Sequence, residues 1–99
     1  MNQAKKYKLM DLIEDIKKVD DMISLHSTNT STFMLEQYKI KKAKLISYLI
    51  DELVEPDLRS AKSFAIIQKL IKRFYPNLKK EAQADVNHQD LNELEAVLV

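Results

Sequence analysis

The 99-residue chain contains no glycine, no cysteine and no tryptophan, and only two prolines. Without glycine it lacks the glycine-dependent motifs that bind nucleotides or calcium, or that present a catalytic serine, because those motifs need backbone conformations that other residues disfavour. Without cysteine it has no disulfide, no thiolate nucleophile and no cysteine zinc site. These absences exclude many classes of enzyme and metalloprotein.

Long hydrophobic runs are absent as well. The N-terminus is polar, and Asp11, Glu14 and Asp15 follow soon after it, so the sequence predicts no signal peptide. The densest apolar runs, such as residues 64–67, are far too short to span a bilayer. We therefore expect a cytoplasmic protein that makes no contact with a membrane.

What remains is the composition of one small globular domain. Apolar residues make up 45% of the chain and charged residues 31%, at a net charge of +1. A chain of this size buries roughly two-thirds of the surface that its unfolded form exposes. One modest hydrophobic core is therefore expected.

Apolar residues recur at helical spacing along the whole chain. The clearest case is a seam whose members alternate by steps of three and four, which predicts an amphipathic helix over residues 4–26. The seam consists of Leu9, Leu12, Ile16, Val19 and Ile23.

Two polar or proline-containing breaks divide the rest of the chain. Ser, Thr and Asn fill residues 27–32 and predict a loop, in which Ser31 or Thr32 caps a second helix running from residue 33 to about 55. Pro56 predicts the next break, with a third helix from residue 57 or 58 to 74.

The last residues carry the pattern of a short helix over 88–98. The predicted fold class is therefore all-α, an up-down bundle or long hairpin of three helices plus a short C-terminal helix. We expect residues 1–80 to form the three-helix core, and residues 81–99 to form an acidic helix or tail. Because so thin a bundle leaves an apolar stripe uncovered, we also expect a homodimer or a subunit of a larger assembly.

Charge is segregated along the sequence. Residues 58–80 hold seven cations and no acid, whereas residues 81–99 hold five acids and neither lysine nor arginine. On a helix, the cations share one stripe that tracks phosphates or is neutralised by the acidic tail or by a partner. Lysine outnumbers arginine by fourteen to two, which disfavours base-specific readout. The stripe comprises Arg59, Lys62, Lys69 and Arg73.

The acidic tail places Leu91, Leu94 and Leu98 on one face of its predicted helix. Three interpretations follow. The tail is the last helix of the bundle, a lid over the basic stripe, or a detachable helix that docks in a partner's groove.

Lys42 stands near the middle of the apolar face of the second helix. A buried lysine can act as a base or nucleophile, but more often it reaches water or pairs with a carboxylate. In a helical hairpin, Lys42 would lie near the level of Ile16 on the first helix, and Asp15 and Asp20 flank that level. We therefore predict a structural ion pair or a polar residue that sets the register of the helices.

No catalytic constellation accompanies this helical pattern. We predict a non-enzymatic protein that acts through protein–protein contacts and self-associates, with the Leu9-to-Ile23 seam and the three tail leucines as interface residues. The alternative is a nucleic-acid-binding regulator that uses the basic stripe, with the acidic tail as a competitor. No cofactor, metal or small-molecule substrate is predicted. An enzyme would need an interhelical pocket and would use Lys42 or His88.

Overall fold

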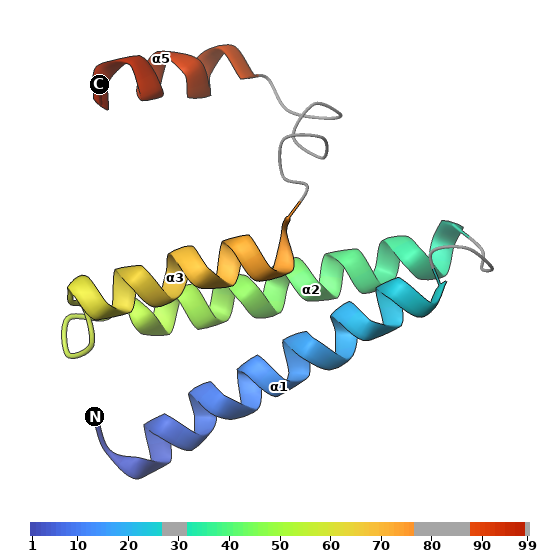
Figure 1. Cartoon of the computed structure of the whole chain (residues 1–99), viewed down its shortest axis with the longest axis horizontal. Helices are drawn as coiled ribbons and strands as arrows, with labels where there is room; N and C mark the ends of the chain where they lie inside the picture. The colour runs from blue at the N-terminus through green and yellow to red at the C-terminus, as the bar shows by residue number, and fades with distance from the viewer. Residues whose placement is uncertain (27–31, 77–87, 99) are drawn as a thin grey trace.

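A computed structural model of the protein describes residues 1–26, 32–76 and 88–98 (Figure 1). These ranges contain four α-helices and no strand, which confirms the predicted all-α class with a short C-terminal helix. The helices are α1 (Gln3–His26), α2 (Thr32–Leu53), α3 (Ala61–Phe74) and α5 (His88–Leu98). Helices α1 and α3 run in one direction and α2 runs in the opposite direction, and together they form a three-helix unit (Figure 1).

The core of this unit lies between one apolar face of each helix. Ile16 of α1 is fully buried, and Leu49 of α2 is almost as inaccessible. Leu70 and Phe74 bring α3 onto the same cluster. The α1 seam supplies three buried residues, as its helical spacing predicts. They are Leu9, Ile16 and Val19.

The third helix begins later than the sequence predicts, at Ala61 instead of residue 57 or 58. Helix α2 ends at Leu53, and a turn follows in which the backbone N–H groups of Leu58 and Arg59 donate to the carbonyl of Glu55. Ser60 then caps α3. Its hydroxyl accepts from the N–H of Ser63 at 3.1 Å, while the Ser63 hydroxyl accepts from the N–H of Ser60 at 2.8 Å.

This reciprocal pair is a capping box, and it explains the shift of the helix start. A capping box usually carries Glu or Gln three residues after the cap, so a serine in that place gives a weak sequence signal. Pro56 lies in the preceding turn and not in the first turn of α3.

The predicted cap of the second helix and the predicted domain boundary remain to be placed. Thr32 is inside α2 and is therefore not its cap, whereas Ser31 and the predicted loop lie outside the described residues. The predicted boundary at residue 80, with Lys79 and Lys80, also lies outside them.

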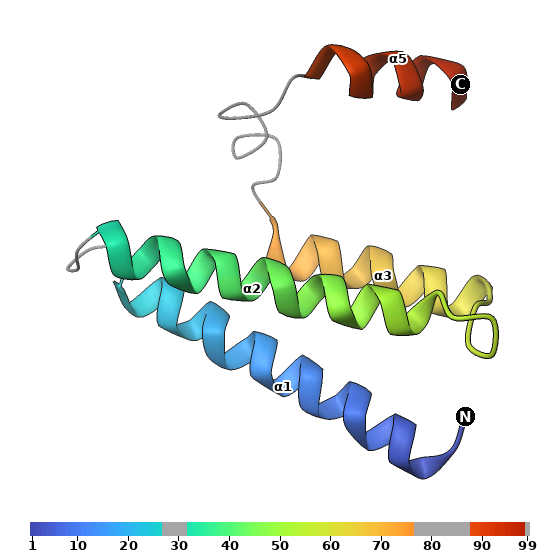
Figure 2. The same cartoon turned by 180° about the vertical axis from the view of Figure 1, so that it is seen from behind.

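Two features of the arrangement leave surface of the helices exposed to solvent. The axis of α1 diverges from the axes of α2 and α3 toward the N-terminus (Figures 1 and 2). Helix α5 stands away from the three-helix unit, and its described side chains, residues 89–98, are all exposed. The structure therefore does not pack α5 as a fourth helix of the bundle.

Candidate interaction groove

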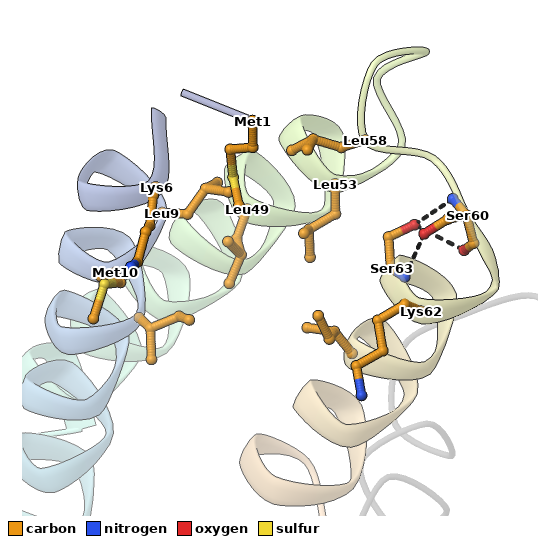
Figure 3. Close-up of a pocket in the computed structure, with 12 residues that line it drawn as sticks. Met1, Lys6, Leu9, Met10, Leu49, Leu53, Leu58, Ser60, Lys62 and Ser63 are labelled. Carbon is orange, nitrogen blue, oxygen red and sulfur yellow. Dashed lines mark hydrogen bonds between the residues drawn. The ribbon is translucent and has the colours of Figure 1, made fainter. Parts of the chain in front are cut away.

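The divergence of α1 leaves an apolar hollow of about 320 Å³ between α1 and α3 (Figure 3). Leu49 and Leu53 of α2 form its floor. Leu9 and Met10 line it from α1, and Ile66 lines it from α3. The hollow is large enough for several apolar side chains.

A second hollow of about 150 Å³ continues along the same seam toward the C-terminal end of α3. Ile13 of α1 and Ile66 of α3 line both hollows, so the two are contiguous. We call them together the α1–α3 groove. It follows α3 over most of its length.

Cations border this groove on both walls. Among the described residues, no carboxylate lines either hollow. Lys17 is paired with Glu14 at 3.3 Å on its own helix. The other four have no salt-bridge partner within the described ranges. The five cations of the groove rim are Lys6 and Lys17 on α1, and Lys62, Lys69 and Arg73 on α3.

The predicted basic stripe is thus partly reproduced. Lys62, Lys69 and Arg73 are exposed and share the wall of α3 that faces the groove. Arg59 does not belong to this stripe, because it lies in the turn before α3 and lines neither hollow. Lys72 is exposed but lines neither hollow.

The predicted interface residues divide into two groups. Leu9, Ile16 and Val19 are buried inside the three-helix unit, while Leu12 and Ile23 are half-buried. The seam therefore packs within the chain. The tail leucines are open to solvent, with exposed fractions of 52% for Leu91, 63% for Leu94 and 86% for Leu98.

Lys42 joins all three helices of the unit. Its Nζ atom lies 2.7 Å from Oδ1 of Asp20 on α1, donates to the carbonyl of Phe74 at the end of α3, and lies 4.5 Å from the centre of the Tyr75 ring. The predicted ion pair with Asp20 is present, whereas Asp15 is exposed. The ammonium group is buried and engaged on several sides, so this arrangement holds the helices together.

A second ionic cluster, which the sequence pattern does not predict, lies at the other end of α1. Lys5 Nζ lies 3.0 Å from Oδ2 of Asp57, and Lys8 Nζ lies 2.9 Å from Oε1 of Glu52. Lys5 also approaches Glu52 at 3.8 Å. The partners are separated by 44 or more positions in the sequence, so no local sequence pattern predicts their pairing.

The hydrogen bonds of this cluster shift the pKa values of its members. The bond from Lys5 lowers the pKa of Asp57, and the bond from Lys8 lowers the pKa of Glu52. The bond to Asp57 raises the pKa of Lys5. Each shift favours the charged form, as expected for paired groups at a surface.

The described part of the chain contains no group of three or more His, Cys, Asp and Glu side chains arranged to hold a metal ion. None of the helices in the described ranges combines the length and apolarity that a membrane span requires. The side chain of His88 lies outside the described residues. Comparison of the chain with protein-family models, curated proteins and solved structures gives no match.

Proposed function

We propose that this protein is a non-enzymatic interaction protein that acts through protein–protein contacts and associates with copies of itself. The observation that carries this proposal is the exposed leucine face of α5, formed by Leu91, Leu94 and Leu98. Apolar side chains that gather on one face of an exposed helix are typical of a contact surface.

The α1–α3 groove supports the same proposal. It exposes an apolar lining between α1 and α3. One small chain therefore presents an apolar helix and an apolar concavity at once. Burying both against other chains removes apolar surface from water and favours association.

Sedimentation of the full chain over a range of protein concentrations tests the proposal. We expect the average mass to rise above that of the monomer with concentration. Replacing Leu91 and Leu94 by serine should weaken self-association by at least about tenfold, since each buried leucine contributes about 1.5–3 kcal/mol.

Asn92 supplies the control. It is exposed and lies on the side of α5 away from the leucine face, so Asn92→Ser should leave the association constant unchanged. A protein that stays monomeric at every concentration, or equal losses in the two variants, would contradict the proposal.

A second candidate function is nucleic-acid binding through the α3 side of the groove rim. Lys62, Lys69 and Arg73 are exposed, share one wall, and have no carboxylate partner among the described residues. If these three cations neutralise three phosphates, affinity should fall about 40-fold between about 50 and 200 mM salt.

Fluorescence polarisation against duplex DNA and single-stranded RNA measures this slope. Lys62→Glu with Lys69→Glu should abolish binding, whereas Lys72→Glu should reduce it far less because Lys72 lies off the groove wall. No binding at low salt would exclude this second function.

A further inference from the structure

Resting on the proposed self-association, we infer that the α1–α3 groove is the binding site for α5 of a second copy of this chain. Each of two chains places its α5 in the groove of the other. Helix α5 and the groove are complementary in three respects, which are apolar pattern, charge and length.

The apolar patterns match. Leu91, Leu94 and Leu98 follow steps of three and four, so they form one narrow face of α5. The groove offers an apolar floor from Leu49 and Leu53 of α2. This is the helix-in-groove mode of recognition, in which residues one turn apart anchor an amphipathic helix.

The charges match on both sides. Asp90 lies one turn from Leu94, and Glu95 lies one turn from Leu91, so the two carboxylates flank opposite edges of the leucine face. The groove rim carries cations on both walls, such as Lys6 on α1 and the α3 residues defined above. When α5 lies in the groove with its leucines against the floor, each of its two acidic edges therefore faces cations of one groove wall.

The lengths match as well. Helix α5 has 11 residues and is about 16 Å long at 1.5 Å per residue. On the α3 wall, the rim cations extend from Lys62 to Arg73, a stretch of helix of about the same length. The length of α5 is therefore about equal to the length of the α3 wall that carries the rim cations.

The second copy is the occupant because the structure places α5 away from its own groove, with every described side chain exposed. An isolated helix of 11 residues is marginal in water and gains stability by packing its apolar face. Reciprocal exchange between two chains buries the apolar face of each α5 in the groove of the other chain. The result is one closed, symmetric dimer. It also doubles the surface that a single docked helix would bury.

Hydrogen exchange of the full chain tests this assignment. Amides of residues 89–98 should become protected as protein concentration rises, in step with the appearance of dimer in sedimentation. A dimer whose α5 amides stay unprotected would overturn the inference while leaving the proposed self-association standing. Protection that does not change with concentration in a monomer would place α5 in its own groove and overturn it as well.

Charge reversal provides a test that does not depend on one variant alone. Lys62→Glu with Lys69→Glu reverses the groove wall, and Asp90→Lys with Glu95→Lys reverses the edges of α5. Each double variant should dimerise at least about tenfold more weakly, because like charges then face each other. Their equimolar mixture should recover dimers, because each α5 then meets a groove of opposite charge.

The recovered dimer must contain one chain of each kind, which mass spectrometry under native conditions identifies. The matched controls are Lys72→Glu and Glu93→Lys, since Lys72 lies off the groove and Glu93 lies off the leucine face. Both should dimerise like the original chain. Failure of the mixture to recover heterodimers, or equal losses in the controls, would overturn the inference.

Discussion

At the scale of single residues, Lys42 shows how this core accommodates a charge. The residue is only 8% exposed, yet its ammonium group reaches an acid, a backbone carbonyl and an aromatic ring. A buried charge is tolerated when it is paired and hydrogen-bonded. The Phe74 carbonyl belongs to the last turn of α3, where a cation is also favoured by the helix dipole.

Removing this pair should destabilise the fold. We expect Lys42→Met to lower the free energy of unfolding by about 1–3 kcal/mol, because the carbonyl and Asp20 lose a charged donor while the apolar stem is kept. A cycle with Asp20→Asn, measured by urea denaturation, should give a coupling energy above about 0.5 kcal/mol. Lys44→Met is the control, since Lys44 is exposed on the same helix. Strictly additive effects would contradict the pairing.

The second ionic cluster makes stability depend on pH. The pKa values of Asp57 and Glu52 are lowered in the folded state, so their contribution is present above the unfolded pKa values and is lost as pH falls through the folded ones. The raised pKa of Lys5 makes its contribution fade only at strongly alkaline pH.

We therefore expect Asp57→Asn with Glu52→Gln to lower the thermal midpoint at neutral pH. The difference from the original chain should shrink below about pH 4, where ordinary carboxyl groups take up protons. Melting curves at several pH values measure it. A difference that persists unchanged in acid would rule out the ionic origin.

At the scale of elements, the start of α3 depends on two serines. Ser60 and Ser63 satisfy each other's backbone N–H groups, which have no partner inside the helix. Ser63 also donates through its hydroxyl to the Ser60 carbonyl at 2.9 Å. This cap fixes where the α3 wall of the groove begins.

Ser60→Ala should cost about 1 kcal/mol of stability, the usual effect of losing an N-cap side chain. Exchange of the amides in the first turn of α3 should become faster. Ser47→Ala, at an exposed position on α2, serves as the control and should be close to neutral. Equal losses in the two variants would show that Ser60 does not act as a cap.

Much of the element order follows from the sequence, because apolar residues at helical spacing mark α1, α2 and α5 directly. The start of α3 does not follow, since a serine pair is a weaker signal than proline. The groove does not follow from the sequence either, because it depends on how α1 diverges from α3. The predicted stripe includes Arg59, which precedes the first residue of α3, Ala61, by two residues, and it does not include Lys6 and Lys17 of α1.

At the scale of the whole molecule, the chain is more extended than its length requires. The radius of gyration is 15.6 Å, compared with about 13 Å for a compact domain of 100 residues. Helix α5 lies apart from the three-helix unit (Figure 1), and a separate helix raises the radius of gyration. A chain that keeps one helix outside its core leaves apolar surface available for other chains.

Self-association should also depend on salt. If carboxylates of α5 meet the groove rim, raising the salt concentration from about 0.1 M to 1 M should weaken the dimer several-fold through screening. The Asp90→Asn with Glu95→Gln variant should lose most of this dependence. Sedimentation at the two salt concentrations measures the association constants of the original chain and of the variant. The same dependence in both would assign the salt effect to other charges.

The position of Lys42 has a consequence for the order of folding. Its contacts join α1, α2 and the end of α3, so they are complete only after all three helices have met. The apolar contacts between α1 and α2 need only one helical hairpin and can form earlier. The ion pair between Lys42 and Asp20 also belongs to that hairpin, whereas the contacts of Lys42 with Phe74 and Tyr75 need α3. Loss of the contacts with α3 should therefore accelerate unfolding more than it slows folding. Lys42 should thus extend the lifetime of the assembled unit chiefly through its contacts with the end of α3.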